Sequence, residues 1–399
     1  IIDSTQINKF PFLSDVPVQA SPIFDDGVLY FVTRENSVTA WSIKDDTILF
    51  NLRFVDPPAR RGMLIYQDKI ESRKTLYFNV SSYIVAVDAF TGEFISEFGE
   101  NGYKKVGFGT SAPMIINDIL ISAINEPPRI IAMNKNNGEE LWSKNIDGGA
   151  PWAGFSIDYD LGIIFVTTGN PKPPLFGGNR INANKEANSL IALNYLNGKT
   201  IWSIQDVYHD LWDFDIASPP SLVNLDYDGF DREVVVAPTK RGNLIVANRR
   251  TGKLIKEPTF YRAPISDVNG EKTAPFQHVI NIPKPFLDHQ FNKDDLRKDL
   301  DRESKINLDN YKMGFFETPS LKKVLISYGL HGGATWPGIS VDKDSNQMFV
   351  AVNKVPWKLR LFLQDFSPKD SFTLEHNGKS LYEEDCSSCH GDKRNGLYI

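Results

Sequence analysis

Short apolar runs that end in a polar turn recur along the chain. The five clearest runs occupy residues 37–46, 84–92, 130–138, 190–198 and 244–252. The alanine at position 40 recurs at positions 86, 132 and 192, so the first two steps are 46 residues long and the third is 60. Units of four short strands that repeat about every 40–50 residues are typical of a β-propeller. The pattern therefore predicts an all-β protein built from repeated sheets.

Other segments between these runs also have the composition of strands, such as residues 27–33 (GVLYFVT) and 162–168 (GIIFVTT). Most of the repeated turns end in glycine, which adopts the positive φ of a tight hairpin at little cost. A partial sixth repeat lies at residues 334–352, and the proline-rich, charged segment 255–308 is predicted to be an insertion or a loop between blades. Each unit must bury its apolar face against its neighbours, so we expect a propeller, with an array of β-sandwiches as the alternative.

The composition of the chain narrows the range of partners. The chain has 399 residues, of which 41% are hydrophobic and 12% aromatic, enough to bury a large core. Its formal net charge is −6 and no stripe of basic residues stands out, which argues against nucleic acid as a partner. No apolar run reaches about 18 residues, so no membrane span is expected in this sequence.

Residues 386–390 read C-S-S-C-H and contain both cysteines of the chain. The spacing C-x-x-C-H is the attachment signal of c-type haem, in which Cys386 and Cys389 form thioether links and His390 ligates the haem iron. A disulfide or half of a zinc site is the alternative, but the other histidines offer no second ligand pair at zinc spacing. Covalent haem implies electron transfer and assembly outside the cytoplasm, so the predicted location is the periplasm.

The haem motif lies close to the end of the chain. Only nine residues follow His390, whereas a small cytochrome c domain needs many more, including a second axial ligand. Residues 1–11 also lack the basic start and apolar run of a signal peptide, although haem attachment implies export. We therefore expect an internal fragment, with a partial propeller at residues 1–365 and the truncated start of an α-helical cytochrome c domain at residues 366–399.

Two polar motifs interrupt the apolar repeats. Residues 208–215 read YHDLWDFD and place three carboxylates beside aromatic rings, and residues 239–242 read TKRG, with Lys240 27 residues after Asp213. With the repeat, these motifs resemble the quinoprotein dehydrogenases, which depend on pyrroloquinoline quinone (PQQ), over roughly residues 25–356. The resemblance implies an eight-bladed β-propeller, incomplete here, and it lies nearest to the membrane-type glucose dehydrogenases, with an added c-type cytochrome.

The resemblance also implies roles for single residues. Asp213 would be the catalytic base, which must lie within hydrogen-bonding reach of the substrate hydroxyl. Lys240 would donate to the quinone oxygens and stabilise the charge that develops on reduction. Trp152, in the sequence GGAPW, would stack against the flat cofactor. The alternatives are an Asp that caps a turn, a surface lysine and a structural tryptophan.

A metal ion is implied in the same way. Asn170 in TTGNP and Glu126 stand where relatives place calcium ligands, and with Asp213 they would offer oxygen ligands to Ca²⁺ or Mg²⁺. Asn353 and Arg61 match residues of the family that contact the cofactor. For each of these positions, an ordinary turn or strand-edge residue is the alternative.

The implied function is oxidation of a sugar or alcohol hydroxyl, with a glucose-type substrate favoured, by hydride transfer to PQQ. Electrons would pass to haem c and then to ubiquinone or a soluble cytochrome, and any association with the inner membrane would come through segments outside this chain. Pro57 stands where the glucose branch has His, and Thr335 where many relatives have Asn, so quinate, shikimate or a simple alcohol stay open as substrates. A cofactor-free propeller scaffold, of the outer-membrane assembly type, is the alternative from another class.

Overall fold

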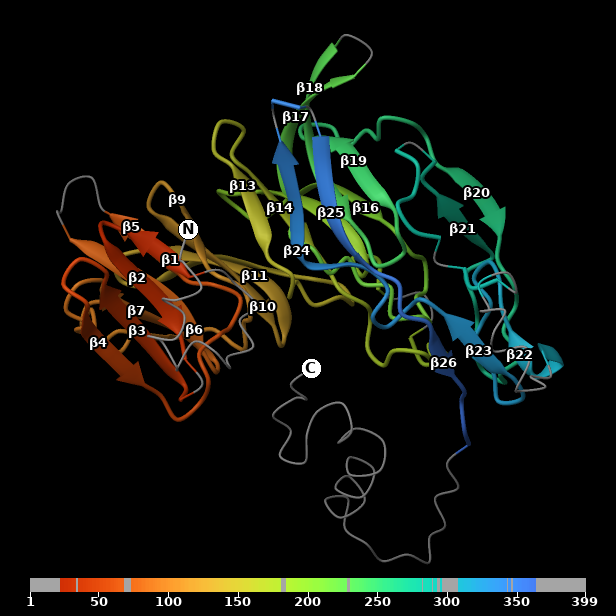
Figure 1. Cartoon of the computed structure of the whole chain (residues 1–399), viewed down its shortest axis with the longest axis horizontal. Coiled ribbons are helices and arrows are strands. Elements are labelled where there is room, and N and C mark those ends of the chain that lie inside the picture. The colour runs from red at the N-terminus through yellow and green to blue at the C-terminus, as the bar shows by residue number, and fades with distance from the viewer. Residues whose placement is uncertain are drawn as a thin grey trace, which may run out of the picture. The chain divides into compact units, whose positions relative to one another are not determined.

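Short antiparallel β-strands form nearly all of the regular structure, with almost no helix (Figure 1). The computed structural model describes residues 22–363, apart from 34, 68–72, 181–183, 228–229, 282, 289, 293–294, 296–307, 343 and 346. The chain divides into two units, Ile1–Leu361 and Phe362–Ile399, and almost all described residues belong to the first. In this described part, no helix is long and apolar enough to cross a membrane.

The first half of the chain folds into four successive four-stranded sheets, in each of which the strands pair in chain order. The first two contain β1 (Ile23–Asp25), β2 (Val28–Val32), β3 (Ser37–Ser42) and β4 (Thr47–Arg53), then β5 (Leu64–Gln67), β6 (Lys74–Val80), β7 (Tyr83–Asp88) and β8 (Tyr103–Lys105). The next two contain β9 (Met114–Ile116), β10 (Ile119–Asn125), β11 (Pro128–Asn134) and β12 (Glu140–Asn145), then β13 (Phe155–Asp158), β14 (Ile163–Thr167), β15 (Ser189–Asn194) and β16 (Thr200–Gln205). The predicted four-strand repeat is confirmed, whereas the count of eight blades stays a prediction.

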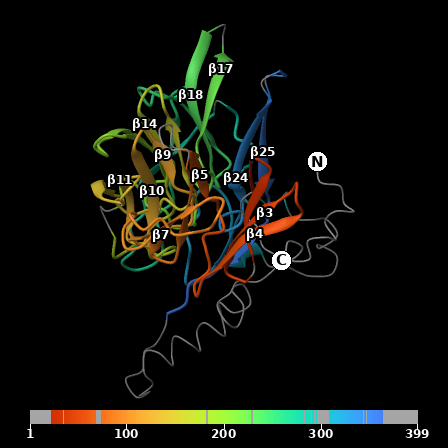
Figure 2. The ribbon, with the colours of Figure 1, turned by 90° about the vertical axis from the view of Figure 1, so that its left-hand side faces the viewer.

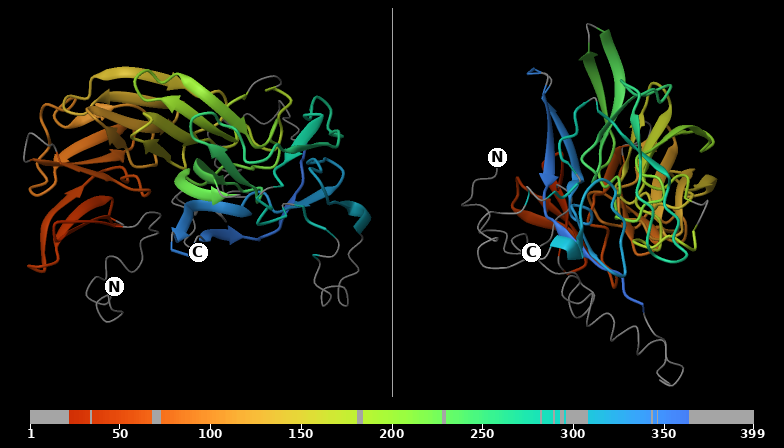
Figure 3. Two further views of the ribbon diagram at one scale, coloured as in Figure 1. Left: turned by 90° about the horizontal axis from the view of Figure 1, so that it is seen from above. Right: turned by 90° about the vertical axis from the view of Figure 1, so that its right-hand side faces the viewer.

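The second half is less regular. A fifth sheet contains β17 (Ser221–Tyr227), β18 (Phe230–Pro238) and β19 (Leu244–Asn248), and β17 and β18 form a long hairpin (Figure 2). The predicted partial repeat at 334–352 is the strand pair β24 (Gly333–Asp342) and β25 (Gln347–Asn353) (Figure 3). The remaining elements are β20 (Thr259–Arg262), β21 (Phe276–Val279), the 3-10 helix η3 (Leu308–Asn310), β22 (Tyr311–Lys312), β23 (Val324–Ser327) and β26 (Trp357–Leu359). The predicted insertion therefore contains a hairpin of its own, β20–β21.

In the second to fifth sheets, the repeated turns follow the third strand and share one hydrogen-bonding pattern. After β7, Oδ1 of Asp88 accepts hydrogen bonds from the backbone N–H groups of Phe90 and Thr91, both at 2.9 Å. Four residues after Asp88, Gly92 closes the turn at a φ of +75°. Asn134, Asn194 and Asn248 begin the matching turns, and Gly138, Gly198 and Gly252 close them at φ values of +70°, +66° and +70°. The first residue of each turn has a short polar side chain that accepts a hydrogen bond from the backbone N–H two residues later, and the last residue is free to take positive φ. These two requirements explain the recurring Asp or Asn and the recurring Gly.

Each of these glycines also receives an aromatic side chain from the preceding sheet. A Cβ on Gly198 would lie 2.5 Å from the ring of Trp142 in β12, and one on Gly252 would lie 2.6 Å from the ring of Trp202 in β16. The Trp142 indole N–H donates to the carbonyl of Tyr195 at 2.9 Å, in the turn that Gly198 closes. Phe50 and Phe98 approach Gly92 and Gly138 in the same way. Successive sheets are thus locked together by a recurring contact between an aromatic ring and a glycine.

Between neighbouring sheets the apolar side chains form shared cores. One cluster joins Val28 and Val38 of the first sheet to Leu76 and Val85 of the second. Further clusters join the second sheet to the third, the third to the fourth and the fourth to the fifth. Face-to-face packing of successive meanders is the way a propeller buries its strands, so the sheets behave as blades.

Candidate active site

The polar motifs come together because the meander fixes where connections lie. In an antiparallel meander, the connection between strands two and three lies at the same end of the strands as the connection from strand four to the next sheet. Arg61, Trp152 and Asp213 lie in connections of the second kind, after β4, β12 and β16. Asn170 follows β14 and Lys240 follows β18, which are connections of the first kind. Residues far apart in sequence therefore converge at one end of the strands, and the repeated glycine turns lie at the other end.

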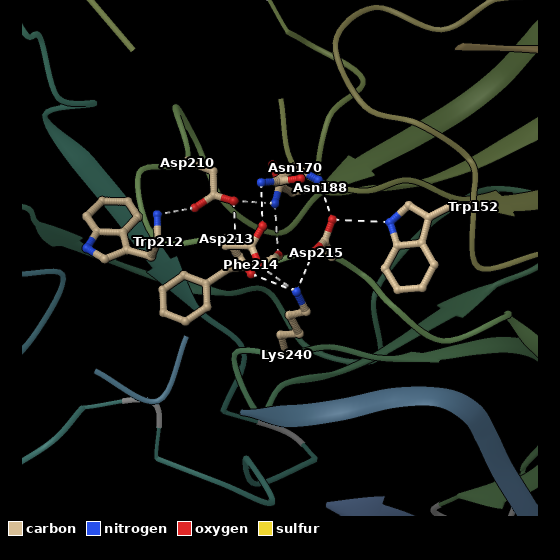
Figure 4. Close-up of polar contacts among 9 residues, drawn as sticks. All are labelled: Trp152, Asn170, Asn188, Asp210, Trp212, Asp213, Phe214, Asp215 and Lys240. Carbon is tan, nitrogen blue, oxygen red and sulfur yellow. Dashed lines mark hydrogen bonds and ion pairs between the residues drawn. The ribbon is translucent and has the colours of Figure 1, made fainter. Parts of the chain in front are cut away.

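Asp210 shapes the segment that carries the other two aspartates. Its Oδ1 accepts a hydrogen bond from the Trp212 N–H at 2.8 Å, and its Oδ2 accepts from the Phe214 N–H at 2.9 Å (Figure 4). The Asn188 side-chain amide donates to the same carboxylate at 2.9 Å. The aromatic rings of Trp212 and Phe214 are buried, while Asp213 between them adopts a φ of +64°. A non-glycine residue in this conformation costs free energy and persists only where its surroundings impose it.

Asp213 and Asp215 share one ammonium group (Figure 4). The Lys240 Nζ lies 2.8 Å from Oδ2 of Asp213 and within hydrogen-bonding distance of Oδ2 of Asp215. All three side chains are largely buried. Because two carboxylates face one cation, the cluster keeps one excess negative charge in a setting where unpaired charge is costly.

The pKa values follow from this arrangement. Burial and the neighbouring Asp215 carboxylate raise the pKa of Asp213 to about 6, although Lys240 opposes the rise. Burial alone would lower the pKa of Lys240, but the Asp215 and Asp213 carboxylates outweigh burial and raise it. Asp213 is thus a carboxylate that can take up a proton near neutral pH, beside a lysine that stays charged.

Asn170 and Trp152 complete the inner cluster. The side-chain amide of Asn170 donates to Oδ1 of Asp213 at 2.5 Å, and its backbone N–H donates to Oδ1 of Asp215 at 2.6 Å. The indole N–H of Trp152 donates to the same Asp215 oxygen at 3.3 Å. The structure therefore brings together four residues that the sequence predicted for the site, namely Trp152, Asn170, Asp213 and Lys240.

Arg61 lies beside Trp152. Its guanidinium carbon is 4.4 Å from the centre of the indole ring, and its Nη1 donates to the Trp152 carbonyl at 3.0 Å. The Thr110 hydroxyl donates to that same carbonyl at 2.9 Å. Burial lowers the pKa of Arg61 to about 10, although Asp215 opposes the shift, so the side chain is still a cation at neutral pH. The indole is thus bordered by a cation at the ring and by Asp215 at its N–H.

Comparison with known proteins places this arrangement in a family. Residues 4–131 and 137–391 match the family described as "PQQ: Glucose/ethanol/alcohol dehydrogenase, beta-propeller domain". The chain belongs to this family. It is 27% identical over 332 residues to quinoprotein glucose dehydrogenase A of Acinetobacter calcoaceticus, covering 71% of this chain and 41% of that protein. It is also 27% identical to a probable quinate dehydrogenase (quinone) of Xanthomonas campestris pv. juglandis, covering 69% of this chain and 41% of that protein.

A solved structure of the family shows the same fold. The quinohemoprotein alcohol dehydrogenase from Comamonas testosteroni superposes with a TM-score of 0.62 at 18% identity, covering 87% of this chain and 53% of that one. The chain spans about two fifths of the length of the curated relatives named above. The relatives carry glucose and quinate names at equal identity, so the likeness does not separate these substrates.

Other predicted quinoprotein residues make no described side-chain contact with the cluster or lie outside the described residues. Glu126 is exposed, and no described contact joins its carboxylate to Asp213 or Asn170. In the described residues no group of three or more His, Cys, Asp or Glu side chains is arranged to hold a metal. Asn353, at the end of β25, is also exposed, and its role stays a prediction. Cys386, Cys389 and His390 lie outside the described residues, as does the predicted cytochrome domain at 366–399.

A second polar layer supports the connection between β18 and β19, which carries Lys240. Arg241 is fully buried, and its Nη1 donates to the Asp206 carbonyl at 2.8 Å. The Asn243 amide donates to the Asp206 carboxylate at 2.9 Å, and Arg241 also donates to the His278 carbonyl. These contacts hold the backbone that directly follows Lys240 in the sequence.

The insertion at residues 255–308 also contacts the segment that carries Asp213. The Glu271 carboxylate lies within hydrogen-bonding distance of His209 Nε2, at 2.9 Å, and accepts a hydrogen bond from the Gly177 N–H. The buried Arg180 donates to the Asp210 carbonyl. Two loops are thus tied to the segment that holds Asp213.

Sequence reasoning missed several residues of this site. Asp210 and Asp215 were noted only as carboxylates of the motif, and Thr110 and Asn188 were not singled out. Three carboxylates within six positions of one segment were a usable signal that more than one of them belongs to the site. Thr110 and Asn188 bond through backbone atoms of distant loops, and such contacts have no signature in a single sequence.

Proposed function

We propose that this chain forms the cofactor-binding part of a PQQ-dependent dehydrogenase that oxidises a sugar or alcohol hydroxyl, with a glucose-type substrate favoured. The proposal is carried by one observation: the Asp213 carboxylate is held by Lys240 and Asn170 beside the Trp152 indole (Figure 4). A buried carboxylate whose pKa lies near neutrality is suited to take a proton from a substrate hydroxyl. The family and the site chemistry thus point to the same reaction.

The residues around Trp152 fit an anionic, planar cofactor. Two cations are present, Arg61 beside the indole and Lys240 within the cluster, and the indole provides a flat apolar surface. The buried hydroxyls of Ser111 and Thr239, neighbours of Thr110 and Lys240 in sequence, have no hydrogen-bond partner among the described residues. Unused hydroxyl groups and fixed cations are the groups that recognise carboxylates and quinone oxygens. PQQ, when bound, would supply the two-electron oxidant for the reaction.

The chain's own residues would then divide the remaining tasks. Asp213 would accept the hydroxyl proton at its carboxylate while the substrate carbon is oxidised. Lys240 would place a positive charge where negative charge develops and would hold Asp213 in its strained conformation. The Asn170 amide oxygen and the Asp213 carboxylate would be ligands for Ca²⁺ or Mg²⁺. Glu126, the third predicted ligand, has no described contact with either residue.

We further propose that electrons leave through haem c at Cys386, Cys389 and His390, and that ubiquinone or a soluble cytochrome accepts them. The C-x-x-C-H spacing supports the haem, and haem attachment in turn supports a periplasmic location. The full-length protein, exported and reduced, should show the absorbance of c-type haem, and replacement of both cysteines, Cys386→Ala with Cys389→Ala, should abolish its covalent attachment. Haem that dissociates in acidified acetone from the wild-type protein would contradict this part of the proposal.

The first experiment is reconstitution of the full-length protein with PQQ and Ca²⁺, followed by dye-linked oxidation of glucose, quinate, glycerol and ethanol. Asp213→Asn keeps the size of the side chain but removes the base, so turnover should fall roughly 10²–10⁴-fold. Asp160→Asn, in an exposed turn, is the control and should leave turnover unchanged. A folded wild-type protein that neither binds PQQ nor oxidises any substrate would refute the proposal and favour the scaffold alternative.

A further inference from the structure

Asp215 makes more contacts to the predicted site residues than any other side chain of the described cluster (Figure 4). Its Oδ1 accepts hydrogen bonds from the Trp152 indole and the Asn170 backbone, and its Oδ2 faces the Lys240 ammonium. No role was assigned to it from the sequence. These three partners come from three different connections, after β12, β14 and β18.

The surroundings of Asp215 are built for close approach. Asp215 is buried, and its backbone carbonyl accepts a hydrogen bond from the Lys240 N–H at 3.2 Å. Gly169 packs against its carboxylate so closely that a Cβ there would collide with both Asp215 and the Trp152 indole nitrogen. The absence of a side chain at Gly169 therefore permits the bond between Trp152 and Asp215. A structural filler would not need both carboxylate oxygens to be occupied by defined donors.

We propose that Asp215 is a positioning residue, which sets the plane of the Trp152 indole and the location of the Lys240 ammonium relative to Asp213. This inference rests on the proposed function for its meaning in catalysis, but its geometry is independent of that function. The indole N–H bond fixes the rotation of the ring about its Cβ–Cγ bond, so the flat surface offered to a planar ligand is set in advance. The anion on the other side of Lys240 prevents the ammonium from turning wholly towards Asp213.

The test compares Asp215→Ala and Asp215→Asn with Asp158→Asn. Asp158 is a matched control, because it is also buried and paired with a cation, Arg249 at 3.1 Å, but it ends β13, away from the connection before β13 that carries Trp152. The readouts are the NMR resonances of the Trp152 indole N–H and the Lys240 ammonium in protein free of cofactor. Trp152→Phe and Lys240→Met assign the two signals.

Asp215→Ala should move the Trp152 indole resonance and raise its rate of exchange with solvent roughly tenfold or more, because the acceptor is lost. Asp215→Asn should perturb at least one of the two signals, since the indole and the ammonium face different carboxylate oxygens and the amide replaces one of these by a donor NH₂ group. The asparagine variant also decides the matter if the alanine variant does not fold. Asp158→Asn should leave both signals in place. Wild-type positions for both signals in Asp215→Asn would overturn the proposal.

A second readout separates this proposal from the proposed function. With PQQ added, Asp215→Asn should weaken binding roughly tenfold, because the indole and the ammonium would no longer be held in place for the cofactor, while Asp158→Asn should not. A wild-type protein that binds no PQQ would refute the proposed function alone, because the indole and ammonium signals would still decide the role of Asp215. PQQ affinity that is equal in the wild type and Asp215→Asn would overturn the positioning role.

Discussion

At the scale of single residues, the same side-chain type performs three tasks within six positions. Asp210 accepts hydrogen bonds from backbone N–H groups and shapes the segment. Asp213 is strained and has a pKa raised to about 6, whereas Asp215 contacts three other elements. The partners decide these tasks, and the partners come from other sheets. A single sequence could show the three carboxylates but could not divide the work among them.

His278 provides a pH-dependent prediction at this scale. Its side chain is buried, and neither ring nitrogen has a hydrogen-bond partner among the described residues. Burial lowers its pKa from 6.5 to about 4, with Asp206 opposing the shift and Arg241 adding to it. The folded state keeps the ring neutral, so below pH 6.5 the unfolded chain binds a proton that the folded chain does not. Stability is therefore lost as the pH falls from about 6.5 towards 4.

The size of this loss can be measured by comparing variants. Between pH 7.5 and pH 5, His278 should account for about 2 kcal/mol of the fall in the free energy of unfolding. His278→Phe should remove that share, because it replaces an unpaired ring by an apolar one, while His331→Phe, at an exposed ring, should change the fall much less. Urea titrations at the two pH values give the numbers. An equal fall in the wild type and in His278→Phe would contradict the assignment.

At the scale of elements, the sequence was most informative where the blade repeats. The aspartate or asparagine that begins each turn and the glycine that closes it are local signals, and all four turns form as predicted. The convergence of Asp213 and Lys240 followed from family motifs, and the meander explains it by placing both connections at one end of the strands. The irregular second half was less predictable, because the insertion forms its own hairpin β20–β21, which breaks the period.

A further prediction concerns the contact between the Trp142 ring and Gly198. Gly198→Ala must take a φ of +66° and must also place a methyl group against the Trp142 ring. Positive φ costs about 1–2 kcal/mol and overpacking about 1–3 kcal/mol, so together we expect a loss of about 2–5 kcal/mol of unfolding free energy. Gly27→Ala is the control, because its φ of +80° is similar but nothing lies within 4 Å of the added carbon.

The control separates strain from docking between sheets. Gly27→Ala should lose only the share due to φ, about 1–2 kcal/mol. Trp142→Phe should cost about 1 kcal/mol, since it removes the hydrogen bond to the Tyr195 carbonyl but keeps most of the ring. Denaturant titration of the three variants provides the comparison. If Gly198→Ala were no worse than Gly27→Ala, the ring would not be a lock between the third and fourth sheets.

At the scale of the whole molecule, the site is the place where separate sheets meet. Arg61 follows the first sheet, Trp152 the third and Asp213 the fourth, while Asn170 lies within the fourth and Lys240 within the fifth. Among the described residues, each of these shared cores joins two neighbouring sheets. A ligand that contacts several of these residues would link sheets that share no core. Binding should then stabilise the described unit as a whole and not one blade alone.

This link yields the last prediction. A ligand that binds only the folded state stabilises it by mass action, about 2.7 kcal/mol at 100 times its Kd. Unfolding followed by near-ultraviolet circular dichroism should therefore shift upward when PQQ and Ca²⁺ are added, in one cooperative transition. Removal of the ion with a chelator should reverse part of the shift, since Asn170 and Asp213 would lose a shared partner. Lys240→Met should abolish the shift, whereas Lys144→Met, at a surface ion pair with Glu186, should keep it. A ligand-induced shift that survives Lys240→Met would place PQQ elsewhere on the protein.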